Sequence, residues 1–414
     1  MPDETLRPLA LFGLFGVGNI GNEASVAAGI AAARRHRPPD AVTVVAADPT
    51  RVSDEHGICA VPMAMAGPVP SFEWSPRPVR VLVRPFVEVA RWLAAYRFVR
   101  SVDALVVPGT GILDDFGSTP QQMPYELFRW SIVARAARRP WAMVGVGAGP
   151  IDHPLSRRLM RRAVKNARLV TYRDEESRDF MAGLGAPGRA IVQPDVAFAL
   201  PRPDRREPVD GTPGEIGLGV MAYYGWGNDP AAGQHVFESY IASMTEIAQR
   251  ILASGRAVRL LIGEQTDIRA AEHVIAALHS SRGAHMGETV LFEPITTFDE
   301  LMLQIAGTEA VVATRYHNVI ASLMTATPAI SIGYADKNRA VMSLFGLEQH
   351  CHHVDDIDVD AVERDLVAVL DRAPQLRVAM RDTADRLARQ VDGCFDATFE
   401  ELVGDRGRPS PVTR

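Results

Sequence analysis

The feature that most constrains the fold is an alternation between short apolar runs and longer stretches with helical periodicity, which occurs in both halves of the chain. Parallel strands are buried on both faces and need a crossover helix between them, so this alternation is typical of a parallel sheet wound with helices. In the first half, strands are predicted at 9–15, 41–47, 104–107, 142–146, 169–172 and 190–192. Helices are predicted between them at 23–35, 87–99, 125–138, 155–166 and 175–182.

A proline-rich segment interrupts the alternation near the middle of the chain. Residues 201–214 contain four prolines together with glycine and charged residues, a composition typical of a linker. The pattern then starts again, with strands predicted at 216–221, 258–262, 289–292, 310–313 and 329–332. Helices are predicted at 236–254, 268–280, 297–306, 318–325 and 338–345, and two more within 359–403.

The sequence therefore predicts an α/β protein with two doubly wound, Rossmann-like domains facing each other across a cleft. The domains are expected at residues 1–200 and 215–375, with 201–214 as the linker. Residues 376–414 are expected to form a helix and a tail, the helix crossing back to the first domain. Residues 48–85 are rich in Pro and Gly without a clear period, so we expect a long loop over the site or an inserted element.

Composition excludes several classes of protein. A net charge of −6 gives no global positive field, so a nucleic-acid partner is not expected. The three cysteines are widely separated and show no paired metal-ligand spacing, which favours free thiols in a reducing compartment. No signal peptide is predicted, and the longest uncharged stretch, 318–335, contains a proline and several hydroxyl residues and is a poor membrane span. We expect a cytoplasmic protein that can act at the inner face of the membrane through peripheral contact.

The loops that leave the strands are where ligands bind in such sheets, because helix N-termini there favour anions. The segment ATRYHN places Arg315 and His317 two residues apart between a predicted strand and a predicted helix. Arg315 has a planar donor fork for carboxylate or phosphate, and His317 can exchange a proton near neutral pH. The alternative is that Arg315 pairs with a structural carboxylate and His317 caps the helix.

Two further cations follow other strands. Lys337 lies in the loop after the next strand and could reach the same anion, although a solvated surface lysine is an equal alternative. Arg173 follows the strand at 169–172 and could join the anion site, whereas Asp174 is expected to cap a helix and Asp195 to be structural.

Two glycine-containing loops carry side chains suited to hydroxyl groups. The first, GVGNIGNE, resembles a dinucleotide fingerprint only loosely, and Asn19, Asn22 and Glu23 suit sugar hydroxyls better than pyrophosphate. Helix capping is the alternative for these three residues. In the second loop, GTGILDD, Asp114 and Asp115 could orient sugar hydroxyls or act as a base, and the ligand set for a metal is incomplete.

Taken in order, the segments GNIGNEA, GTGILDD, GVGAGP, TYRDEESRDF, PDVAF, ATRYHNVIAS and GYADKNRAVMSLFGL resemble the polysaccharide pyruvyl transferase family, from about residue 11 to 347. The resemblance implies a glycosyltransferase-B-like fold and the transfer of pyruvyl from phosphoenolpyruvate onto two sugar hydroxyls as a ketal, with phosphate released. It implies no cofactor beyond this co-substrate and no metal. The acceptor would be a polysaccharide or glycolipid precursor, which a lipid could carry.

The resemblance also implies roles for individual residues. The catalytic residues would be His317, which in its protonated form would act on the donor, and Arg315. The donor would be held by Arg315, Lys337, Arg173 and Asn318. The acceptor would be held by Asn19, Asn22, Glu23, Asp114 and Asp115.

Two other functions fit the same sequence. A nucleotide-sugar glycosyltransferase of similar architecture would use Arg315 and Lys337 to bind a diphosphate. A carbohydrate-binding protein without catalysis is the alternative from another class, against which the retention of Arg315, His317 and Lys337 in neighbouring loops argues.

Overall fold

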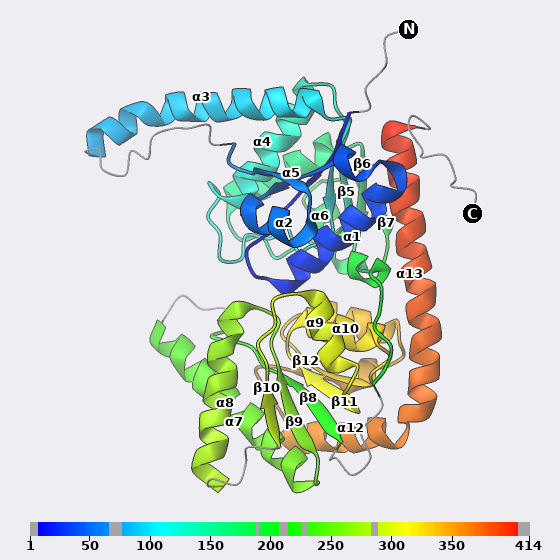
Figure 1. The fold of residues 1–414 in the computed structure, drawn as a ribbon. Helices are drawn as coiled ribbons and strands as arrows, with labels where there is room; N and C mark the ends of the chain where they lie inside the picture. Colours follow the sequence, from blue (N-terminus) through cyan, green and yellow to red (C-terminus); the bar gives the residue numbers. More distant parts are fainter. Residues whose placement is uncertain are drawn as a thin grey trace. The chain divides into compact units, whose positions relative to one another are not determined.

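The computed structural model describes residues 7–65, 77–187, 190–206, 214–225, 230–282 and 289–404, and it divides into two compact units (Figure 1). Unit 1 comprises Met1–Val17, Asn22–Leu200 and Arg389–Arg414. Unit 2 comprises Gly18–Gly21 and Pro201–Ala388. Each unit contains one parallel sheet flanked by helices.

The sheet of unit 1 has seven parallel strands in the order β3-β2-β1-β4-β5-β6-β7. The strands are β1 (Leu9–Phe12), β2 (Val42–Ala46), β3 (Cys59–Pro62), β4 (Ala104–Pro108), β5 (Trp141–Val146), β6 (Leu169–Tyr172) and β7 (Ile191–Val192). The helices are α1 (Ile20–His36), α2 (Pro49–His56), α3 (Arg77–Ser101), α4 (Met123–Ala136), α5 (Pro154–Asn166) and α6 (Glu175–Gly183). The strand order reverses between β1 and β4, which defines the doubly wound topology and its switch point.

The core of unit 1 is aromatic at its centre. Phe12 of β1 packs against Trp130 of α4 and Trp141 of β5, with ring centroids 5.5 Å apart in both pairs. The last helix, α13 (Ala373–Val403), adds Phe395 and Phe399, which are fully buried. The carboxyl-terminal part of α13 therefore belongs to the hydrophobic core of unit 1.

The sheet of unit 2 has six parallel strands in the order β10-β9-β8-β11-β12-β13. The strands are β8 (Glu215–Gly219), β9 (Ala257–Leu261), β10 (Val290–Phe292), β11 (Ala310–Ala313), β12 (Ala329–Gly333) and β13 (Cys351–His353). The helices are α7 (Pro230–Ala253), α8 (Ile268–Arg282), α9 (Phe298–Ile305), α10 (Tyr316–Met324), α11 (Asp336–Ser343) and α12 (Val359–Asp371). The order reverses between β8 and β11, so the carboxyl ends of β9, β8, β11 and β12 lie side by side at the switch point.

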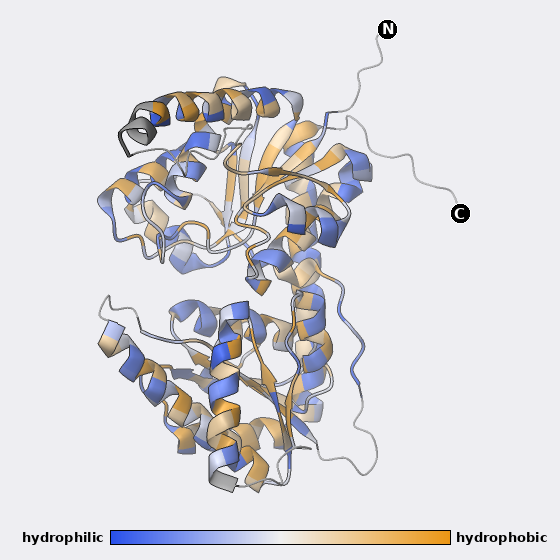
Figure 2. Ribbon diagram, turned by 60° about the vertical axis from the view of Figure 1, so that its left-hand side comes forward, coloured by the Kyte–Doolittle hydropathy of each residue, from blue (hydrophilic) through white to orange (hydrophobic). Residues whose placement is uncertain are grey.

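The predicted α/β architecture is confirmed, and each strand and helix predicted from periodicity lies on an observed element. Figure 2 shows the reason, because the strands of both sheets are predominantly hydrophobic while the helices carry polar outer faces. The edge strands β3 and β13 were not predicted; β13 is a short strand of polar residues and gives no apolar run. The predicted linker has no regular element at 201–206, and 207–213 lie outside the described residues.

The expectation of a long loop or inserted element at 48–85 is wrong for the described residues. Asp48 caps α2 by accepting hydrogen bonds from the amides of Thr50 and Arg51, and Gly57 ends that helix in the left-handed conformation with φ of +57°. The chain then forms edge strand β3, and α3 begins at Arg77. Residues 66–76 lie outside the described part. The helix and strand were missed because both are short and contain proline.

Candidate functional site

The candidate site lies in unit 2, at the carboxyl ends of β8, β9, β11 and β12. Arg315 lies between β11 and α10 and is the N-cap residue of α10. Its Nε donates to Asp267 Oδ2 at 2.9 Å and its Nη2 to Asp267 Oδ1 at 2.6 Å, while Glu264 Oε2 lies 3.0 Å from Nη2. The guanidinium is therefore held by a bidentate ion pair and a second carboxylate, which is the structural pairing that the sequence left open.

Besides pairing with Arg315, Asp267 also accepts hydrogen bonds from two backbone amides. Its side chain is fully buried, and its oxygens also accept hydrogen bonds from the amides of Ala222 (2.9 Å) and Gly263 (3.2 Å). Burial by itself would lower the pKa of Arg315, but the charge of Asp267, its hydrogen bonds and the charge of Glu264 outweigh burial and raise that pKa. Arg315 is therefore permanently charged, and most of its charge is compensated inside the protein.

His317 is half-buried in the first turn of α10. Its ring lies edge-on to that of Tyr316, with centroids 5.2 Å apart, and to that of Phe298 at 6.4 Å. A Cβ atom at Gly21 would lie 2.1 Å from His317 Cε1 and Nδ1. Only glycine allows the chain to pass this close to the imidazole.

Residues 18–21 of the glycine-containing loop belong to unit 2. The amide of Ile20 donates to the carbonyl of Gly263 at 3.2 Å, and Asn19 forms a bridge with Glu264. Unit 2 therefore contains residues 18–21 together with the ATRYHN segment, although the two are nearly 300 residues apart in the sequence.

Lys337 is half-buried in the first turn of α11. Its ammonium lies 4.7 Å from the ring centroid of Tyr334 and 5.7 Å from that of Tyr316, both cation–π contacts. Within the described part of the chain it has no carboxylate partner. Since Tyr316 also contacts His317, the lysine and the histidine share an aromatic neighbour.

Two further features of α10 bear on ligand binding. Its N-cap residue, Arg315, makes no capping hydrogen bond through its side chain, and the positive end of the helix dipole lies at this turn. Asn318 is fully buried, and neither atom of its side-chain amide has a hydrogen-bond partner among the described residues. The amide lies beside the ends of β8 and β9, because a Cβ at Gly219 would lie 2.8 Å from its nitrogen and one at Gly263 3.0 Å from its oxygen.

The remaining predicted donor-binding residue, Arg173, belongs to unit 1. Its side chain is largely buried, with Nε 3.4 Å from Asp174 Oδ2 and Nη1 3.5 Å from Asp195 Oδ2. Asp174 also caps α6 through the amide of Ser177, which confirms its predicted role.

The predicted acceptor residues have different surroundings. Asn19 Oδ1 accepts from the amide of Gly21 at 3.1 Å, which is a local capping interaction, and Asn22 is half-buried in the first turn of α1. Glu23 is buried, and both carboxylate oxygens accept from the amide of Gly16, at 3.0 and 3.2 Å. Glu23 therefore holds its own loop, and a role in hydroxyl recognition loses support.

The two aspartates of GTGILDD also differ. Asp115 accepts hydrogen bonds from the amides of Asp152 (2.8 Å) and His153 (2.9 Å) and so fixes the chain before α5. Asp114 is half-buried and accepts from the amide of Phe116. Asp114 is the better candidate for a ligand contact. Across the described residues, no group of three or more His, Cys, Asp or Glu side chains could hold a metal ion.

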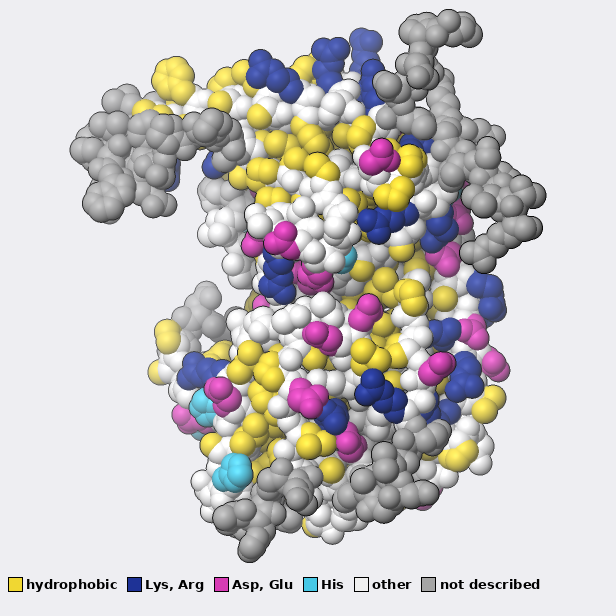
Figure 3. All heavy atoms as spheres, in the orientation of Figure 1, with side chains coloured by type: hydrophobic (Ala, Val, Ile, Leu, Met, Phe, Trp, Pro, Cys, Tyr) yellow, Lys and Arg dark blue, Asp and Glu magenta, His cyan; other side chains and the backbone are white. Residues whose placement is uncertain are grey.

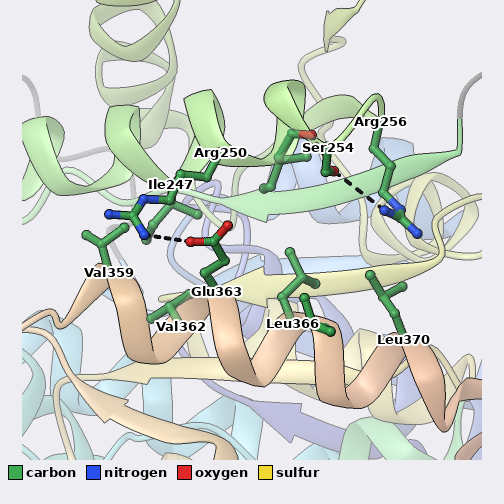
Figure 4. Close-up of a pocket in the computed structure, with 11 residues that line it drawn as sticks. Ile247, Arg250, Ser254, Arg256, Val359, Val362, Glu363, Leu366 and Leu370 are labelled. Carbon is green, nitrogen blue, oxygen red and sulfur yellow. Dashed lines mark hydrogen bonds and ion pairs between the residues drawn. The ribbon is translucent and has the colours of Figure 1, made fainter.

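A pocket of about 50 Å³ lies between α7 and α12 (Figure 4). Its floor is aliphatic, with Ile247 and Leu366, and Arg250 at its edge bonds Glu363 as well as Glu246 and Asp360. This arginine is neutralised by three carboxylates, so we do not assign anion binding to this pocket.

Several residues of the site were not predicted. Glu264 and Asp267 follow β9, and Tyr334 follows β12. Their position directly after predicted strands could have indicated that they belong to the site. No feature of the neighbouring sequence indicates that Asp267 pairs with Arg315, which is 48 residues away. Tyr240 of α7 was also missed; its hydroxyl lies 2.8 Å from Thr314 Oγ1, and burial raises its pKa, so it stays neutral.

Comparisons with known proteins show which solved structures share this fold. Three solved structures have the same fold over nearly the whole chain. HepE of Anabaena in complex with UDP has 11% sequence identity and a TM-score of 0.59, and the match covers 95% of this chain and 99% of that chain. UDP-GlcNAc 2-epimerase of Neisseria meningitidis bound to UDP-GlcNAc has 10% identity and a TM-score of 0.57, with 96% of this chain and 100% of that chain covered. The glycosyltransferase SnogD of Streptomyces nogalater has 15% identity and a TM-score of 0.52, with 96% of this chain and 99% of that chain covered. A comparison with curated proteins gives no match.

The two doubly wound sheets and these neighbours define an α/β protein of the glycosyltransferase-B fold. A model of the polysaccharide pyruvyl transferase family matches residues 19–336, from the glycine-containing loop to the residue before Lys337. The chain belongs to the polysaccharide pyruvyl transferase family. In the part of the chain that the structure describes, no helix combines the length and the apolar character that a membrane crossing needs.

The pairing of Asp267 gives a first prediction. Asp267→Ala leaves Arg315 charged with only Glu264 as partner and two backbone amides without an acceptor, and should lower the free energy of unfolding by about 3–5 kcal/mol. Chemical denaturation followed by circular dichroism measures it. Glu272→Ala, at an exposed position of α8, is the control and should change stability by less than about 0.5 kcal/mol. Equal losses in both variants would show that the pair does not organise the site.

Proposed function

We propose that this protein transfers the pyruvyl group of phosphoenolpyruvate onto two hydroxyls of one sugar, forming a ketal and releasing phosphate. The observation that carries the proposal is the placement of His317 and Lys337 around Tyr316, next to the fixed guanidinium of Arg315, in a chain of this family. The proposed acceptor is a sugar of a polysaccharide or glycolipid precursor.

Donor binding follows from the charges of the cluster. Asp267 and Glu264 compensate Arg315, so Lys337 is the cation with charge to offer an incoming anion. The N-terminus of α10, which has no side-chain cap, adds a favourable field for phosphate or carboxylate. Nη1 of Arg315 makes no hydrogen bond to the described residues and can donate to the same anion. The amide of Asn318 supplies a further donor and acceptor.

In the proposed reaction, protonated His317 gives its proton to the methylene carbon of phosphoenolpyruvate, and C2 becomes cationic. A sugar hydroxyl adds to C2 and loses its proton to the imidazole. The bond from C2 to the phosphate oxygen then breaks, and a neighbouring hydroxyl adds to C2 while its proton leaves with phosphate. Fixed positive charge around the phosphate lowers the barrier to its departure, and holding both hydroxyls in place makes ring closure intramolecular.

Acceptor binding rests on fewer observations. Asn19, Asn22 and Asp114 remain our candidates, with Arg173 as a candidate for either substrate. The carboxylates of Glu23 and Asp115 already accept backbone hydrogen bonds, so we leave both out. We place the reaction in the cytoplasm, where phosphoenolpyruvate is made, and the three cysteines, all free thiols, agree with a reducing compartment.

A coupled phosphate assay tests the proposal. The protein is incubated with phosphoenolpyruvate and a panel of lipid-linked and nucleotide-linked sugars, and phosphate should be released only with a suitable acceptor, whose mass rises by that of a pyruvate ketal. Nucleotide release from sugar nucleotides without phosphoenolpyruvate would instead identify a glycosyltransferase. Turnover of neither donor, with phosphoenolpyruvate failing to bind in calorimetry, would favour a carbohydrate-binding protein.

His317→Ala should lower kcat by about 100- to 10,000-fold, because general acid–base catalysis contributes that range. The expected change in stability is small, since the ring is only half-buried. His279→Ala, at an exposed position of α8, is the control and should retain full activity. A kcat near that of the unmodified protein would remove His317 from the mechanism.

Lys337→Gln should raise KM for phosphoenolpyruvate by about tenfold or more, because a charge-assisted contact to the anion is lost. KM for the acceptor should change little. Initial rates at varied donor and acceptor separate these effects, and Lys337→Arg should recover part of the affinity. An unchanged donor KM would mean that Lys337 is a surface cation without a ligand.

A further inference from the structure

Helix α3 presents an apolar stripe on its outer face. On its inner face, Trp92 Nε1 donates to the hydroxyl of Tyr125 on α4 at 2.9 Å, and that hydroxyl donates to Glu88 at 2.6 Å. The outer face carries Phe86, Val89 and Leu93, which are 76%, 58% and 50% exposed. Their spacing of three and four residues places them on one side of the helix. Phe86 is the most exposed large hydrophobic side chain of those described.

Positive charge continues this stripe. Arg97 and Arg100 follow at the next spacings of four and three, and Arg97 has no ion pair within the described ranges. The sequence of α3 contains six arginines and one acidic residue, Glu88, although the whole chain carries a net charge of −6. Figure 3 shows hydrophobic and basic side chains projecting together at the outer edge of unit 1, over α3.

Another helix of unit 1, α5, is also rich in basic side chains. Helix α4 packs between α3 and α5, and α5 contains no acidic residue. Its exposed basic side chains are Arg157, Arg158, Arg161, Arg162 and Lys165. This part of unit 1 therefore combines an exposed apolar stripe with a concentration of positive charge.

We propose that the outer face of α3 is a docking surface for an anionic lipid bilayer. An amphipathic helix with aromatic and aliphatic side chains on one face and arginines around them lies in the bilayer interface, where the apolar groups enter the acyl boundary and the guanidiniums reach the phosphates. Charge complementarity selects an anionic surface. The inference does not depend on the proposed reaction.

Vesicle sedimentation tests the proposal. The full-length protein is mixed with vesicles of equal parts phosphatidylglycerol and phosphatidylethanolamine, or of phosphatidylcholine alone. We expect at least about tenfold stronger partition into the anionic vesicles at low salt, weakening as salt rises because exposed charges are screened. Phe86→Glu/Leu93→Glu should reduce this partition by about tenfold or more. Arg97→Gln/Arg100→Gln should reduce it by about tenfold and weaken its salt dependence.

Matched variants control for surface changes as such. Ile191→Glu/Val378→Glu replaces two hydrophobic side chains that are each 63% exposed elsewhere, and Arg381→Gln/Arg386→Gln removes two exposed arginines of α13. Both should bind anionic vesicles within about twofold of the unmodified protein. Thermal unfolding of each variant, followed by circular dichroism, verifies that it is folded.

Three results would overturn the proposal. The unmodified protein could stay in the supernatant with both kinds of vesicle, or the folded α3 variants could sediment as it does. Alternatively, analytical ultracentrifugation could show a dimer that Phe86→Glu/Leu93→Glu dissociates, without vesicle binding, in which case the stripe contacts a second copy of the chain.

Discussion

The buried ion pair between Asp267 and Arg315 is the interaction on which the candidate site depends. One carboxylate receives the guanidinium through two hydrogen bonds and the amides of Ala222 and Gly263 through two more. The loops that leave β8, β9 and β11 therefore meet at a single group. Because an uncompensated charge is costly inside a protein, neither partner can move without the other, and the start of α10 is fixed.

The residues to which we assign the proposed chemistry lie next to this ion pair. Tyr316 and His317 form the first turn of α10, and Lys337 reaches the same aromatic ring from the first turn of α11. The imidazole also lies against the backbone at Gly21, where there is no room for a side chain. Preorganisation of this kind would favour the proton transfer to carbon that we propose, since a proton donor that must first be ordered loses much of its effect.

The two cations of the cluster, Arg315 and Lys337, differ in how far carboxylates compensate their charge. Two acidic residues compensate the charge of Arg315, so this residue would offer a ligand hydrogen-bond donors in a fixed orientation more than net charge. The charge of Lys337 is not compensated in this way and would attract an anion. An anion bound there would be attracted mainly by Lys337 and the start of α10. The sequence suggested that Arg315 and Lys337 could hold the same anion, but it did not indicate this division between them. It also means that Arg315 and Lys337 should respond differently to substitution, one in stability and the other in donor affinity.

The sequence by itself determined the architecture and the type of side chain at the site. Apolar runs such as β11 and β12 specify buried strands, and the polar loops after them mark Arg315, His317 and Lys337. The edge strands β3 and β13 were not predicted from the sequence, because they are short, half-exposed and lack a continuous apolar run. Only the tertiary structure decided which residues meet. Asp267 reaches Arg315 because the parallel strands β9 and β11 align their carboxyl ends, whereas Gly21, which follows β1 of the other sheet, reaches His317 because residues 18–21 fold with unit 2.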